Sequence, residues 1–237
     1  MEVVYEDNHI IIVNKQSGEI VQGDKTGDRP LSDIVKDYIK EKYQKPGAVF
    51  LGVVHRLDRP VSGLVIFART SKALTRLNKM FAEGDIHKTY WAIVKRGERS
   101  DVRGKINDDW QTLEHWLVRN EKQNKSYAYP TEKPNAKKAI LKYRTLAHSD
   151  NYTLLEVRLL TGRHHQIRCQ LAAMGCPIKG DLKYGAPRSN PDGSISLMAR
   201  RVEFVHPVSK APITVEAPVP NDTLWQALAP KEESPKA

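Results

Sequence analysis

Cysteine is scarce in this chain of 237 residues, which has only Cys169 and Cys176. Two thiols without matched partners predict neither a disulfide-stabilised scaffold nor a structural zinc site. Long apolar runs are also missing, and none approaches the roughly 18 residues that a membrane-spanning helix needs. The acidic N-terminus, Met1 to Asp7, lacks the basic and apolar regions of a signal peptide. These absences predict a protein of the reducing cytoplasm, not attached to a membrane.

Several motifs of common enzymes are absent as well. The chain has no phosphate-binding Gly-Lys-Ser/Thr loop, no dinucleotide-binding GxGxxG, no GxSxG and no HExxH. His164 and His165 are adjacent, so their side chains diverge in a strand or a helix and make a poor metal pair. ATP-dependent and metal-dependent hydrolytic chemistry are therefore disfavoured.

Acidic residues are outnumbered, because 38 Lys and Arg against 28 Asp and Glu give a net charge of +10. Such a surplus attracts polyanions, although it also serves solubility alone. The excess is concentrated in residues 121–150, as Lys122, Lys125, Lys133, Lys137, Lys138, Lys142 and Arg144 against Glu121, Glu132 and Asp150. A solvated surface and a rim that binds a nucleic-acid backbone both explain this segment.

Strand and helix signals do not alternate regularly along the chain. Apolar strands are expected near residues 3–5, 10–13, 64–68, 87–94, 139–146, 152–160, 197–205 and 213–217. Helices are expected over 33–43 with Ser32 as N-cap, over 71–83 with Gly84 as C-cap, and over 169–174, and residues 95–135 are expected to be polar and irregular. This order predicts an α+β fold with a mixed, mostly antiparallel central sheet and flanking helices.

One polar stretch, His55 to Pro60, stands between the apolar segments 49–54 and 64–68. Pro60 and Gly63 favour a turn, so Asp58 is expected on a turn between two strands. The arginines on either side favour its ionised form. An aspartate that caps its own turn is the simpler interpretation, and a nucleophile or general base is the alternative.

A second polar block runs from Thr161 to Arg168. An arginine from this block could hold Asp58 ionised through a bidentate pair. Surface solvation or a structural ion pair explains Arg163 and Arg168 as well. Tyr90 lies in an expected strand, where a core aromatic residue is the simpler interpretation.

Five blocks in order resemble the RluA-type RNA pseudouridine synthases. They are Tyr5 to Lys15, His55-Arg56-Leu57-Asp58 with Ser62-Gly63, Lys88 to Ala92, Thr161 to Arg168 followed by Gly175 to Gly185, and Ala199 with Phe204 to Pro207. The chain departs from the usual pattern at Val61, Gln170 and Met198, none of which matches an assigned catalytic position. Together the blocks extend from about residue 3 to about residue 217.

This resemblance implies a catalytic cleft for RNA and a reaction that needs no cofactor, nucleotide or metal. Uracil leaves C1′ of a uridine, rotates and rejoins through C5. Asp58 matches the catalytic carboxylate, which either attacks C1′ or assists departure of the base. Tyr90 matches the tyrosine that packs on the base, and Arg163 matches the basic partner of the aspartate. The substrate-binding residues implied are His55, Arg56, Gln166, Ile167 and Arg168.

The resemblance also sets the expected organisation of the chain. Residues 1–229 are expected to form the catalytic domain without an N-terminal RNA-binding module, and residues 230–237 a frayed tail. A monomer that acts on ribosomal or transfer RNA is expected. The alternatives are a non-catalytic RNA-binding protein on the same scaffold, and a base-excising glycosidase in which Asp181 supplies a second acid.

Overall fold

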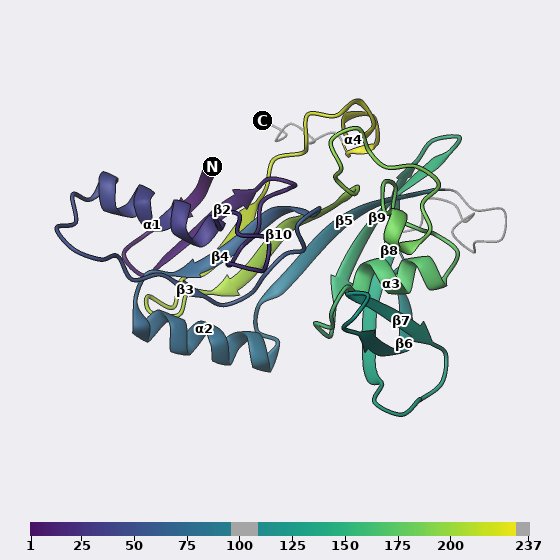
Figure 1. Cartoon of the computed structure of the whole chain (residues 1–237), viewed down its shortest axis with the longest axis horizontal. Coiled ribbons are helices and arrows are strands. Elements are labelled where there is room, and N and C mark those ends of the chain that lie inside the picture. Colours follow the sequence, from purple (N-terminus) through teal and green to yellow (C-terminus); the bar gives the residue numbers. More distant parts are fainter. Residues whose placement is uncertain (96–108, 231–237) are drawn as a thin grey trace. The chain divides into compact units, whose positions relative to one another are not determined.

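The computed structural model describes residues 1–95 and 109–230, which form two compact units (Figure 1). The first unit comprises Met1–Lys88, Asp192–Ser194 and Met198–Ala217, and the second comprises Thr89–Pro191, Ile195–Leu197 and the chain from Pro218 on. The expected frayed tail lies outside the described residues except for Pro230. Within the described ranges, no helix is long and apolar enough to cross a bilayer.

The sheet of the first unit has the strand order β1-β2-β4-β10-β11, and β3 also pairs with β4. Its elements are β1 (Glu2–Glu6), β2 (Ile10–Lys15), α1 (Leu31–Lys42), β3 (Gly52–Val53), β4 (Ser62–Ala68), α2 (Ser71–Glu83), β10 (Leu197–Val205) and β11 (Pro212–Glu216). The residues of β2 are buried on both faces, as are those of β4 from Gly63 on, which explains their continuous apolar sequence.

The two helices of this unit differ in how well their starts were predicted. Thr70 caps α2 by accepting a hydrogen bond from the Ala73 backbone N–H, and Gly84 ends it in the left-handed conformation, so the prediction for α2 is confirmed. The prediction that Ser32 caps α1 is wrong. The helix begins at Leu31, because Pro30 provides an extended entry, and Ser32 is buried inside the first turn.

The second unit contains a sheet with the strand order β5-β9-β8-β6-β7. Its elements are β5 (His87–Lys95), β6 (Gln111–Asn120), β7 (Lys125–Tyr129), β8 (Lys137–His148), β9 (Tyr152–Leu159), α3 (Gln166–Ala173), a 3₁₀ turn η2 (Leu182–Tyr184) and α4 (Thr223–Leu228). The prediction of an irregular segment over 95–135 is wrong for its described part. A β6–β7 hairpin occupies it, and polar residues on the solvated face of these strands concealed the pattern.

Helix α3 packs against β6 and β7 and closes the core of this sheet. Leu117, Ala139, Cys169 and Tyr184 form a buried cluster there. Arg168 anchors the helix through two hydrogen bonds to Asp181, from Nε at 2.7 Å and from Nη2 at 2.9 Å. Among the described residues, strand pairs within each unit are antiparallel except for β4 with β10, so the predicted mixed, mostly antiparallel sheet is confirmed.

Gly63 lies where β4 pairs with β10, at a position that only glycine can occupy without a steric clash. Its φ is +109°, and a Cβ atom at this position would overlap the backbone nitrogen and oxygen of Ala199. We therefore expect Gly63→Ala to lower the free energy of unfolding by about 2–4 kcal/mol, measured by chemical denaturation. Gly84→Ala is the matched control, because φ is +83° and no atom lies near its Cβ. Equal losses in the two variants would contradict the proposed overlap.

Candidate active site

Asp58 lies on a tight turn between β3 and β4, in the first unit. Its carbonyl oxygen accepts a hydrogen bond from the Val61 N–H at 3.0 Å, which closes the turn over Arg59 and Pro60. Leu57 and Val61 are buried on either side, whereas Asp58 itself is half-buried. Two apolar anchors thus hold a carboxylate at the protein surface, as the sequence predicts.

Lys15, the last residue of β2, supports this turn from beneath. The side chain is fully buried, and Nζ donates to the carbonyl oxygens of Gln16, Arg59 and Val61 at 3.0, 3.1 and 2.6 Å. Burial lowers the pKa of Lys15 to about 8, while the carboxylates of Glu19 and Asp58 act in the opposite direction. The sequence analysis assigned Lys15 no supporting role, although it ends one of the blocks that resemble the family and follows Asn14 and the apolar residues Ile10–Val13.

The side chain of Arg59 contacts an acidic loop in the first unit. Its Nη1 donates to Asp28 Oδ2 and its Nη2 to Thr26 Oγ1, both at 2.7 Å. Arg59 also accepts, through its carbonyl oxygen, a hydrogen bond from the Gly18 N–H at 2.9 Å. The residue after Asp58 is therefore held by the loops that follow β2. Arg56, by contrast, is exposed to solvent.

His55 is a neutral structural group in this site. Its Nε2 accepts a hydrogen bond from the Ile66 N–H at 2.9 Å, so the ring proton is on Nδ1. Burial, together with the nearby ammonium group of Lys88, lowers the pKa of His55 to about 3. The ring packs 4.9 Å from that of Phe81 in α2. A neutral, bound His55 fixes the approach of the chain to Asp58 and is not protonated to imidazolium at neutral pH.

In the second unit, Tyr90 and Ile167 lie in buried surroundings. Tyr90 is 6% exposed in β5 and pairs in register with Val157, so its ring is on the core face of the sheet. Ile167 is 5% exposed in the first turn of α3. Both are suited to an apolar wall rather than to a solvated contact.

Arg163 is exposed, and its backbone is held by Gln166. The Gln166 Oε1 atom accepts hydrogen bonds from the Arg163 N–H at 3.0 Å and from Thr161 Oγ1 at 2.8 Å. The Arg163 Nε–H donates to the Lys138 carbonyl at 3.0 Å. Among the described residues, its terminal amino groups make no other hydrogen bond, so they can bind a carboxylate or a phosphate. Gln166 is thus positioned as a scaffold of the loop.

Arg168 and Asp181 neutralise one another inside the second unit. Their side chains are 6% and 1% exposed, and the pair is bidentate. This partnership occupies the donors of Arg168 that a substrate would need. It also removes Asp181 as a free acid for the glycosidase alternative, because its carboxylate oxygens accept hydrogen bonds from a fixed guanidinium group.

The two adjacent histidines stack rather than diverge. His164 and His165 have ring centroids 3.8 Å apart, because His165 adopts a left-handed backbone conformation with φ of +51°. Ser126 Oγ and Asn124 Oδ1 contact the two ring nitrogens of His164, and the Tyr184 hydroxyl contacts His165 Nδ1 at 2.9 Å. These contacts tie the β6–β7 turn to the start of α3.

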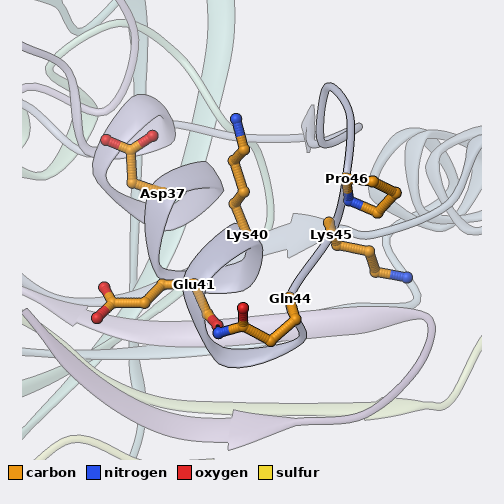
Figure 2. Close-up of a pocket in the computed structure, with 6 residues that line it drawn as sticks. All are labelled: Asp37, Lys40, Glu41, Gln44, Lys45 and Pro46. Carbon is orange, nitrogen blue, oxygen red and sulfur yellow. Dashed lines mark hydrogen bonds between the residues drawn. The ribbon is translucent and has the colours of Figure 1, made fainter.

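A hollow beside α1 contains none of the candidate residues. Figure 2 shows the six exposed residues that line it and that carry both charge signs, namely Asp37, Lys40, Glu41, Gln44, Lys45 and Pro46. Among the residues that the structure describes, no group of three or more His, Cys, Asp or Glu side chains is arranged to hold a metal ion.

The comparisons with known proteins agree on one family. The model of the RNA pseudouridylate synthase family matches residues 9–173. Ribosomal large subunit pseudouridine synthase D of Xanthomonas campestris is 31% identical over 100% of this chain and 71% of its own length. tRNA pseudouridine synthase C of Pectobacterium carotovorum is 30% identical over 96% of this chain and 61% of its own length.

Solved structures with a similar fold include pseudouridylate synthases. The structure of human RNA Pseudouridylate Synthase Domain Containing 4 has a TM-score of 0.74 and 20% identity, and covers 94% of this chain and 90% of its own. The family match and the curated relatives agree with the ordered motifs around Asp58 and Thr161 to Arg168. The chain therefore belongs to the RluA-type RNA pseudouridine synthases, enzymes that isomerise uridine in RNA to pseudouridine.

Proposed function

We propose that this chain isomerises specific uridines of ribosomal or transfer RNA, with Asp58 as its catalytic carboxylate. The observation that carries the proposal is the turn of Asp58, closed by the Val61 N–H and supported by Lys15. A carboxylate on a rigid turn keeps a constant position during a reaction at C1′. We further propose that residues 1–229 act as one catalytic domain and that the protein works as a monomer.

The reaction breaks the N1–C1′ bond of uridine and forms a C5–C1′ bond, and the proton of C5 is lost while N1 gains one. Asp58 either attacks C1′ or assists departure of the base, and either step needs an ionised carboxylate. Tyr90 and Ile167 provide apolar surface for a flipped base, whose extrusion costs a few kcal/mol. Arg163 has terminal amino groups to offer to Asp58 or to the RNA backbone.

The non-catalytic alternative needs only a basic surface and leaves Asp58 without a task. The contacts that close the turn are made by the backbone of Asp58, Arg59 and Val61 and by the side chain of Lys15. A half-buried carboxylate held between the buried residues Leu57 and Val61, close to the Lys15 ammonium group, supports catalysis over simple RNA binding.

We expect Asp58→Asn to lower the isomerisation rate by about 10²–10⁴-fold or more, while RNA binding and stability change little. The measurement is carbodiimide-based pseudouridine mapping of RNA from cells with and without the gene, complemented by wild type, Asp58→Asn or Asp85→Asn. Asp85 is exposed after α2, so Asp85→Asn is a matched control that should restore every lost site. Restoration by Asp58→Asn would reject the catalytic role.

We expect Lys15→Met to lower the rate by about tenfold or more, because the carbonyl groups of Gln16, Arg59 and Val61 lose their buried donor and the Asp58 turn loosens. In the wild type, activity should also fall as pH rises through about 8, where Lys15 loses a proton and one N–H donor. The folded protein releases this proton at a lower pH than the unfolded chain, so this ionisation does not itself reduce stability above pH 8.

Single-turnover rates between about pH 6.5 and pH 9.5 test this expectation. The residual activity of Lys15→Met should show no decline near pH 8, and thermal unfolding of the wild type should show no matching loss of stability. An unchanged alkaline decline in the variant would assign that titration to a different group.

A further inference from the structure

One face of the sheet in the second unit carries exposed basic residues and half-buried aromatic residues that the catalytic proposal does not use. Alternation along β8 separates it from the core, because Ala139, Leu141 and Tyr143 are buried whereas Lys138 and Lys142 are exposed. We call this surface the outer face and define it by the side chains of Trp116, Tyr129, Lys138, Lys142 and Arg158, together with Trp110, which contacts Arg158.

The outer face is opposite the face that holds Tyr90. Thr89 pairs with Arg158, and Tyr90 with the buried Val157, so Arg158 and Tyr90 point to opposite sides of the β5–β9 ladder. Helix α3 packs with Leu117 and Ala139 on the core side. Further along β9 the same side of the sheet is buried at Glu156 and Leu154, so the outer face is only the exposed part of this side, and it holds none of the candidate catalytic residues of this unit.

Two like charges are placed opposite one another on this face. Lys142 in β8 pairs in register with Arg158 in β9, and both side chains are exposed. Like charges directly across an antiparallel ladder destabilise it. Glu114 pairs with Lys138 at 2.7 Å, and Glu156 with Arg144, but no ion pair within the described residues involves Lys142 or Arg158. An unneutralised cation pair of this kind fits an anionic ligand.

Trp110 adds a stacking surface next to these cations. The guanidinium carbon of Arg158 lies 4.3 Å from the centroid of the indole ring, and that of Arg144 lies 5.0 Å from it. Cation–π contact holds both planes in place. Aromatic rings and guanidinium planes are the surfaces on which unpaired RNA bases stack, whereas an acidic protein would need only the charges.

We propose that the outer face binds a single-stranded segment of RNA, with backbone phosphates at Lys142 and Arg158 and a base stacked beside Trp110. The inference rests on the proposed function for the origin of the RNA, since it describes a second contact with a substrate of that class. The sheet of this unit is narrow, because only β9, β8 and β6 lie between β5 and the edge strand β7 and neighbouring strands are about 4.8 Å apart. An RNA strand that bends around β7 can therefore reach the outer face.

The test measures binding of a fluorescein-labelled oligoadenylate by anisotropy at several salt concentrations. Oligoadenylate contains no uridine, so its binding does not depend on isomerisation. The experiment therefore tests the outer face even if the catalytic proposal is wrong. The double variant Lys142→Glu/Arg158→Glu should weaken binding by about tenfold or more and reduce the slope of log affinity against log salt by about 1.4, since each phosphate contact on a single strand contributes about 0.7. Trp110→Ala should weaken binding by about fivefold or more.

The matched control is Lys40→Glu/Lys45→Glu, which makes the same change in charge on two exposed lysines of the hollow in Figure 2. It should stay within about twofold of the wild type. Equal weakening by both double variants would show that net charge alone explains the effect, and would overturn the proposal. Unchanged binding by the outer-face variants would also overturn it. If an oligoglutamate peptide binds more tightly than oligoadenylate and loses affinity in the outer-face variant, the surface takes an acidic protein and the RNA proposal fails.

Discussion

Three backbone carbonyl groups converge on the ammonium group of Lys15, and the shape of the Asp58 region depends on this contact. A buried lysine is costly unless each of its donors is paired. Because the partners are the carbonyls of Gln16, Arg59 and Val61, the same charge fixes the end of β2 and both sides of the turn. The hydrogen bonds that the buried Lys15 ammonium group requires therefore also fix the position of the Asp58 carboxylate on the turn.

Most of the fold was predictable because burial leaves a local pattern. The continuous apolar residues of β2 and β4 and the C-cap Gly84 of α2 define their elements without reference to the rest of the chain. The β6–β7 hairpin was missed because one of its faces is solvated, so apolar residues there are too widely spaced to stand out. Its regular structure comes from pairing with β8, which only the folded chain provides.

The candidate site was predictable where neighbours in sequence are neighbours in space. The Asp58 turn follows from Pro60, Gly63 and the apolar segments around them. Contacts between distant residues gave no local signal, such as the buried pair of Arg168 with Asp181 or the support of Asp58 by Lys15. The outer face depends in the same way on strand register, because Lys142 and Arg158 become neighbours only when β8 and β9 pair.

The parallel pairing of β4 with β10 has a consequence for biosynthesis. Met198 and Ala199 pair with Ser62 and Gly63, so the edge of β4 next to the Asp58 turn is completed by a strand that leaves the ribosome 136 residues later (198 − 62). Until then that edge has unpaired backbone groups, which favour mispairing with other chains. During translation the region around Asp58 therefore stays incomplete until β10 has been synthesised, and termination before β10 would leave the edge of β4 exposed.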